Sequence, residues 1–328
     1  MLENVFSLII IGMVNQIGIN ADSGTINGDL TVLEKMLHEF EQAGFSSIEI
    51  PVHGLDCIIN GKLEYHQVSL VKHILGKYSF SYTVHAPDAL NLAAQYYPET
   101  HLEALQATID FASEINAKIV VYHGSWKIGG KGYGESKPTA SPHCFNPINS
   151  EILINYWEDE IERLEKIASY AKQRGIIIAV ENIFRQNAGE LTYRIDPRQL
   201  ATIVSAVDSP FLRICFDFGH AFISAHEEGL SIEHALKAVL PYLAHVHIHD
   251  NFGRQFSESS GSSRPIDMIF QGMGDLHLVP GMGSIPYQSL FPIFMPQYQG
   301  VLMMEIHPRF KDRYEMAINW AENIRDHT

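Results

Sequence analysis

Cysteine is scarce in this sequence. The three residues Cys57, Cys144 and Cys215 lie far apart along the 328-residue chain, and none belongs to a C-x-x-C pair. An odd number of widely spaced cysteines argues against a disulfide framework and is typical of proteins from reducing compartments. We therefore expect a cytoplasmic protein without structural disulfides.

Long apolar runs are also missing. The run near the N-terminus, VFSLIIIGMV (residues 5–14), has ten residues, whereas a membrane-spanning helix needs about 20. The residues before it, MLEN, contain no basic side chain, which a secretory signal peptide would carry. These features predict no membrane association, and we interpret residues 7–14 as the buried first strand of the fold.

Positive charge is in short supply. Lys and Arg number 23 against 38 Asp and Glu, which gives a formal net charge of −15 with histidine neutral. An acidic surface repels phosphate backbones, and the main group of lysines, Lys127, Lys131 and Lys137, lies in one loop, so general affinity for nucleic acid is disfavoured. With 46% hydrophobic residues and no long run of like charge, the chain is expected to be globular.

Strand and helix patterns alternate along the whole chain. Eight aliphatic runs are predicted as strands: residues 7–14, 46–52, 80–86, 117–124, 176–182, 211–218, 243–250 and 301–307. Segments with apolar residues three and four apart separate them, for example Leu33, Leu37 and Phe40. Eight repeats without a linker predict one α/β domain over residues 1–328, a (β/α)8 TIM barrel. A doubly wound sheet is the alternative, but no G-x-G-x-x-G follows the first strand.

Two connections are longer than the others. They run from about Ser125 to Asn149 and from Asn251 to Gly283, after the fourth and seventh predicted strands. In a barrel, both would lie over the carboxyl ends of the strands, where enzymes of this fold keep their active sites. We interpret them as lids rather than as plain surface loops.

Histidine, in contrast, is abundant, with 17 residues. The segment HVHIHDNFG (245–253) places His245, His247 and His249 at alternate positions, which is the period of a β-strand. A strand buried on both faces should be apolar throughout, so this row of imidazoles indicates a special environment. We expect His247 at the level of a site, His245 one layer deeper as a supporting residue, and His249 nearest the loop.

Ionisable side chains close six consecutive predicted strands. The third to sixth strands end at His85, His123, Glu181 and Asp217, the seventh and eighth carry His247 and Glu305 near their ends, and His220 follows three residues after Asp217. A single such residue commonly caps a helix or satisfies a loop amide. In a barrel, however, all six would converge, and clustered carboxylates are costly without a cation. Mixed His, Asp and Glu ligands suit Zn²⁺, Mn²⁺, Fe²⁺ or Co²⁺ better than Mg²⁺ or Ca²⁺.

The two long loops carry further candidate residues. Asp275 and His277 form a D-x-H pair within GDLHLVPGMG (274–283), where glycines allow the chain to fold back. Lys131 lies in a glycine-rich stretch and is a candidate for gripping a sugar phosphate, and Arg254 is a candidate for steadying a substrate oxyanion. Solvated loop cations are the alternative interpretation of both, because glycine-rich loops without the P-loop pattern are weak indicators.

Seven short segments carry a resemblance to a known family. In chain order they are HAP (85–87), VVYHG (120–124), VENI (180–183), FDFGHAF (216–222), HIHDN (247–251), GDLHLVPGMG (274–283) and MEIH (304–307). Together they resemble the xylose-isomerase-like TIM-barrel superfamily, which includes sugar-phosphate isomerases and epimerases and also endonuclease IV. The match runs in order through the third to eighth predicted strands.

The isomerase and epimerase branch implies one divalent ion (manganese, zinc, cobalt or magnesium) and a sugar or sugar phosphate as substrate. The residues that match its metal ligands are Glu181, Asp217, His247 and Glu305. Glu181 and Glu305 would also act as acid and base, moving a proton through an enediolate. The residues expected to bind substrate are His85, His123, His220, Lys131 and Arg254.

The endonuclease IV branch implies three zinc ions and cleavage of abasic-site DNA. Its additional ligands match His85, His123, His220, Asp275 and His277. Three features depart from that branch: HAPDALNLA offers Asp88 and Ala89 where bulky DNA-inserting residues are expected, Met282 replaces a glutamate, and the chain is acidic.

We therefore predict a metal-dependent sugar isomerase or epimerase, with the endonuclease IV-like hydrolase as the alternative and nucleic acid as a partner only in that case. A lyase or dehydratase using the same enediolate chemistry and a sugar-binding barrel without catalysis stay open. The oligomeric state, including a homo-oligomer, also stays open, since no heptad or repeat indicates a defined interface.

Overall fold

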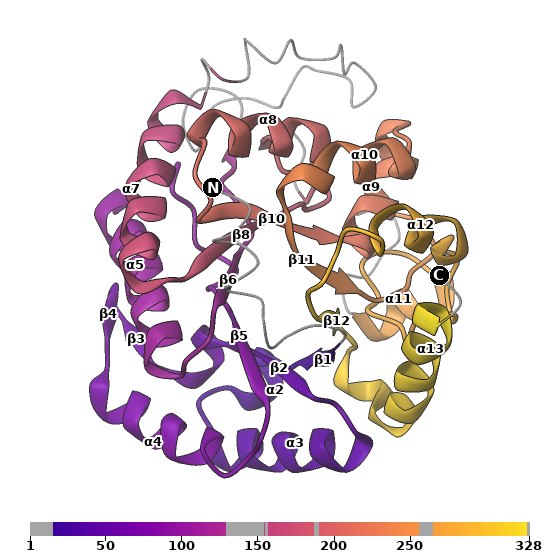
Figure 1. The fold of residues 1–328 in the computed structure, drawn as a ribbon, viewed down its shortest axis with the longest axis horizontal. Coiled ribbons are helices and arrows are strands. Elements are labelled where there is room, and N and C mark those ends of the chain that lie inside the picture. Colours follow the sequence, from indigo (N-terminus) through magenta and orange to yellow (C-terminus); the bar gives the residue numbers. More distant parts are fainter. Residues whose placement is uncertain (1–15, 129–153, 155–156, 187–189, 256–264, 327–328) are drawn as a thin grey trace.

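The computed structural model describes residues 16–128, 154, 157–186, 190–255 and 265–326. Within them, eight parallel strands form a closed barrel in the order β1-β12-β11-β10-β8-β6-β5-β2. Helices lie around the outside of this barrel (Figure 1). The predicted (β/α)8 TIM barrel is therefore confirmed.

The barrel strands lie close to the predicted runs, with one exception. They are β1 (Ile17–Asn20), β2 (Ser47–Pro51), β5 (Ser81–His85), β6 (Ile119–Tyr122), β8 (Ile177–Glu181), β10 (Leu212–Asp217), β11 (Leu243–Ile248) and β12 (Leu302–Met304). The exception is the first strand. The segment IGIN, which is β1, pairs with both β12 and β2 and closes the barrel. The prediction of residues 7–14 as the first barrel strand was wrong. It favoured the longer aliphatic run over the short segment IGIN, which contains a glycine. Residues 7–14 themselves lie outside the described residues.

Helices follow most barrel strands. The described α-helices are α2 (Ser23–Ile26), α3 (Leu30–Ala43), α4 (Tyr65–Leu75), α5 (Pro98–Glu114), α7 (Glu158–Arg174), α8 (Pro197–Val207), α9 (Phe218–Glu228), α10 (Ile232–Val239), α11 (Pro265–Gln271), α12 (Tyr287–Phe294) and α13 (Tyr314–Asp326). Helix α3 illustrates the local causes: Asp29 caps its first turn, and Gly44 ends it with φ of 98°. Its predicted stripe of Leu33, Leu37 and Phe40 is buried.

Three 3-10 helices and two small sheets complete the described elements. They are η1 (Val52–Leu55), η2 (Leu240–Tyr242), η4 (Pro308–Arg313), the hairpin of β3 (Ile58–Ile59) with β4 (Lys62–Leu63), and the pair of β7 (Lys127–Ile128) with β9 (Glu190–Leu191). None of the described helices has the length and apolar character needed to cross a membrane.

Side chains of the barrel strands alternate between two environments. Outward-facing residues such as Ile48, Ile178 and Val246 are fully buried in the layer between strands and helices. Inward-facing residues fill the barrel itself and end in the ionisable side chains at its carboxyl mouth. The strand period therefore places the predicted residues on the inner face.

The two long loops are described only in part. Most of the first, residues 129–149, lies outside the described residues, and so does Lys131. The second contains α11 and a segment that returns to the barrel, where Asp250 and Leu278 form an isolated antiparallel bridge. That bridge brings Asp275 and His277 to the mouth. The lid function of both loops stays a prediction.

Candidate metal centre

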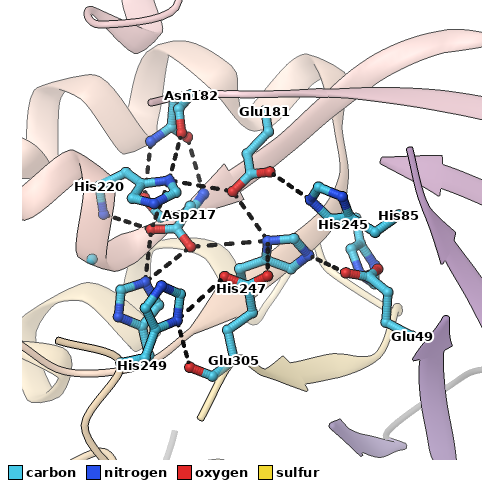
Figure 2. A network of polar contacts seen from close by, with 12 residues as sticks. Glu49, His85, Glu181, Asn182, Asp217, His220, His245, His247, His249 and Glu305 are labelled. Atoms are coloured by element: carbon cyan, nitrogen blue, oxygen red, sulfur yellow. Dashed lines mark hydrogen bonds and ion pairs between the residues drawn. The ribbon is translucent and has the colours of Figure 1, made fainter. Parts of the chain in front are cut away.

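Four predicted ligands meet at the centre of the mouth. Glu181, Asp217, His247 and Glu305 are all buried, and one donor atom of each lies within 4.8 Å of the others. His247 Nδ1 is 3.1 Å from Glu181 Oε1, 3.4 Å from Glu305 Oε1 and 3.9 Å from Asp217 Oδ2. Figure 2 shows the His247 ring among these carboxylates.

Strand register and capping hold these side chains in place. Asp217 ends β10 in register with His247 of β11, so both side chains reach the same level. Its carboxylate also accepts a hydrogen bond from the His220 backbone N–H and thereby caps α9. Asn182 joins the two strand ends, because its side chain donates to the Asp217 carbonyl at 2.9 Å and accepts from the Asp217 N–H at 3.0 Å.

Burial and neighbouring charges move the pKa values of the two glutamates in opposite directions. Burial alone would raise the pKa of Glu181, but the imidazoles of His247 and His123 hold it well below its usual range. Burial raises the pKa of Glu305, and the nearby Glu181 charge acts in the same direction, against His247. One glutamate is thus held as a carboxylate while the other retains its proton more readily.

The donor set fits a divalent ion. Three carboxylates and one imidazole offer the ligand types that Zn²⁺, Mn²⁺ and Co²⁺ accept. Glu181 Oε2 is buried and has no hydrogen-bond partner among the described residues. A buried carboxylate oxygen without a hydrogen bond is what a ligand position would provide, and this oxygen faces His85 and His123.

Two more groups flank this cluster. His85 and His123 approach Glu181 Oε2 at 3.5 and 3.3 Å, and the three residues form a second possible metal-binding set. Burial lowers the pKa of His123 to about 4. For His85, the contacts with Glu181 and Asp88 override burial and raise the pKa to about 10.

The third group lies toward the second long loop. Asp275 Oδ2 is 3.0 Å from His220 Nε2 and 2.8 Å from His277 Nε2, and Asp275 Oδ1 is 3.5 Å from His249 Nδ1. These four side chains also form a possible metal-binding set. Burial alone would lower the pKa of His277, but Asp275 raises it to about 10. The structure therefore brings His220, Asp275 and His277 to the same mouth.

Arg254 and His249 follow the end of β11. Arg254 is exposed and donates to the Gln271 carbonyl at 2.9 Å. His249 lies nearest the loop, as expected, and contacts Asp275 there. It is also fully buried and lies 3.2 Å from both carboxylate oxygens of Asp217. Its ring lies against the backbone at Gly219, where an added Cβ would come within 1.9 Å of it. Only glycine allows this approach.

Sequence reasoning missed Glu49. This residue of β2 is fully buried and contacts both His245 and His247. The signal was present, since an acidic residue at the third position of the strand SIEIP faces the same side as Ser47 and Pro51. His53, after the same strand, was also missed and lies 3.6 Å from Asp88 at the mouth.

Comparison with known proteins agrees with this geometry. The family model described as xylose isomerase-like TIM barrel matches residues 37–325. The chain belongs to this family. Among curated relatives of this family member, the uncharacterized protein MJ1311 of Methanocaldococcus jannaschii is 26% identical over 279 residues, which cover 83% of this chain and 78% of that protein.

Solved structures with the same fold include sugar epimerases. A D-tagatose 3-epimerase-like protein superposes with a TM-score of 0.65 and 23% identity, covering 95% of this chain and 98% of that chain. The D-psicose 3-epimerase of Clostridium cellulolyticum, solved with D-tagatose, gives a TM-score of 0.62 and 16% identity, covering 94% and 99%. At these identities the similarity shows the fold of this xylose isomerase-like barrel.

Proposed function

We propose that this protein is a divalent-metal-dependent isomerase or epimerase of a sugar or sugar phosphate. The observation that carries the proposal is the buried set of Glu181, Asp217, His247 and Glu305, in which two glutamates with opposite pKa shifts face one point. The epimerase activities named for similar structures support the substrate class.

The two glutamates divide the proton transfer between them. A divalent ion held by the four residues would polarise the sugar carbonyl and the adjacent hydroxyl, which acidifies the carbon-bound proton. Glu181, held as a carboxylate, would accept this proton from the carbon beside the carbonyl. Glu305, whose pKa is raised, would donate a proton to the neighbouring carbon or to the opposite face.

Histidines around the cluster would orient the sugar. His85, His123 and His220 surround Glu181, and each presents ring nitrogens that can hydrogen-bond to hydroxyl groups. Lys131 stays a candidate for binding a phosphate, and Arg254 would have to leave the Gln271 carbonyl to reach a substrate. A cytoplasmic location and a homo-oligomer also stay predictions.

Two measurements test this proposal. Elemental mass spectrometry on protein purified without chelators should find about one divalent ion per chain. Incubation with a panel of ketoses, aldoses and their phosphates in D₂O should place deuterium on the carbon next to a carbonyl, and Glu181→Gln should abolish this exchange. An intact metal site with no exchange in any sugar would contradict the assigned reaction.

A zinc hydrolase is the second candidate, and one observation favours it. All nine positions that match endonuclease IV ligands are described, and they fall into three possible metal-binding sets around Glu181. Three zinc ions could activate a water molecule and stabilise a phosphodiester transition state. Three zinc ions per chain together with cleavage of abasic-site DNA would establish this activity, whereas one ion and sugar exchange would exclude it.

A further inference from the structure

Glu49 is a carboxylate enclosed within the barrel. Its side chain is fully buried, and its described ion-pair partners are two histidines of β11. Glu49 Oε1 lies 2.9 Å from His247 Nε2, while Oε2 lies 3.2 Å from His245 Nε2 and accepts a hydrogen bond from the Thr83 hydroxyl at 2.9 Å. Burying a charged carboxylate at this depth costs free energy unless the carboxylate is paired with nearby donors.

His247 is contacted by carboxylates from two sides. Its Nε2 faces Glu49, whereas its Nδ1 faces Glu181, Asp217 and Glu305 at the mouth (Figure 2). A neutral imidazole carries its proton on one nitrogen and offers a lone pair on the other. Without a cation, Nδ1 lies 3.1 Å from Glu181 Oε1, and the same argument applies to both nitrogens. With a divalent ion among the three carboxylates, the Nδ1 lone pair would face that ion, and the carboxylate beside Nε2 would favour the proton there.

The contacts of Glu49 also fix its own position. Thr83 lies opposite Glu49 in the register of β2 and β5, and its hydroxyl holds the oxygen that faces His245. The other oxygen is thereby directed at His247, across the barrel from β2 to β11. The side chains of Glu49, Thr83, His245 and His247 are all fully buried, so bulk solvent does not reach these contacts.

We propose that Glu49 is a positioning residue, which holds the His247 ring with Nε2–H toward itself and Nδ1 toward the three carboxylates, and so strengthens divalent metal binding. This inference rests on the metal site of the proposed function. Glu49 is not one of the four proposed ligands, although donor atoms of His85 and Glu305 lie within 4.8 Å of its carboxylate. Its role is to choose which nitrogen of His247 is the donor.

Cobalt binding to Glu49→Gln tests the proposal. This substitution keeps the shape of the side chain and removes its charge, so the dissociation constant for Co²⁺, measured by competition with a chromophoric chelator, should rise about 10- to 100-fold. The matched control is Ile119→Val, a buried interior change in the separate apolar cluster of β6, β8 and β10, which should leave Co²⁺ affinity unchanged.

A second readout is measured on the wild-type protein, with a variant used only to assign the signal. In histidine-¹⁵N-labelled wild-type protein loaded with Zn²⁺, the His247 ring, assigned by its absence in His247→Asn, should show a proton on Nε2 and metal on Nδ1. The opposite arrangement would overturn the proposal, as would unchanged Co²⁺ affinity in Glu49→Gln. If the wild-type protein binds no divalent ion at all, the proposed function itself fails, which is a different result.

Discussion

Two halves of the barrel interior differ sharply beneath the same mouth. Under β6, β8 and β10 the inward side chains are Ile119, Val121, Ala179 and Cys215, which form a small apolar cluster of their own. Under β2, β5 and β11 the interior residues are Glu49, Thr83 and His245, and all of them are fully buried. The apolar half lies below two of the proposed carboxylate ligands. The polar half places the Glu49 carboxylate against the proposed imidazole ligand, His247, which Cys215 of the apolar half also contacts.

The difference matches the proposed ligands above each half. A carboxylate can use either of two equivalent oxygens, so Glu181 and Asp217 can be oriented by contacts at the mouth alone, such as those that both make with His220. An imidazole must have one particular nitrogen deprotonated in order to bind a metal. Buried polar side chains below His247 can therefore fix its protonated nitrogen only if they lie on the same side of the barrel as His247.

The largest expected effect lies at the mouth above both halves. Glu305→Gln or Glu181→Gln should lower kcat about 10²- to 10⁴-fold, because each removes one partner of the proton transfer. The rate should be measured at saturating Co²⁺, with bound metal determined on the same samples so that lost metal is not mistaken for lost chemistry. A variant that keeps its metal and retains more than a tenth of the wild-type rate would contradict the assigned roles.

Truncation in the apolar half should affect stability alone. Ile119→Ala leaves a cavity in a closed cluster and should lower the free energy of unfolding by about 2 to 5 kcal/mol in urea titrations. The dissociation constant for Co²⁺ should stay within twofold of the wild-type value. A parallel loss of affinity would show that the two halves are not independent.

Removal of the metal should destabilise the protein as a whole. Binding to the folded state adds about 2.7 kcal/mol when the free ion is at 100 times its dissociation constant. Thermal unfolding with and without a chelator should therefore show a lower Tm in the chelated sample, and added Co²⁺ should restore it. If protein shown to contain the metal had the same Tm after chelation, a metal centre with ligands from several strands would be contradicted.

The smallest effect is expected for Thr83→Val in the polar half. Valine has nearly the same shape but cannot donate to Glu49, so Glu49 loses one of its fixing contacts and keeps its charge. Hydrogen bonds to charged groups contribute about 1.5 to 3 kcal/mol to stability, and part of that loss should appear as a less than tenfold rise in the Co²⁺ dissociation constant. Co²⁺ affinity reduced as much as in Glu49→Gln would mean that orientation, rather than charge, dominates.

The sequence predicted most of the fold and most of the residues that lie together in the candidate metal centre. Alternating strand and helix patterns predicted seven of the eight barrel strands, and residues at strand ends such as Glu181, Asp217 and His247 were found because each closes an aliphatic run. The first strand was missed because IGIN is short and contains glycine, and it becomes a strand through pairing on both sides. Glu49 was missed because a single acidic residue within a strand gives no sign of its partners.

The two-residue period of a strand is a local property of the backbone, so the sequence alone determined which side chains face the interior. Which of them meet depends on the stagger between strands, which no single strand encodes. Asp217 lies in register with His247, whereas Glu181 lies in register with Cys215. Only the closed barrel decided that His247 lies between Glu49 and the three carboxylates of the mouth, because these residues come from five different strands or strand ends.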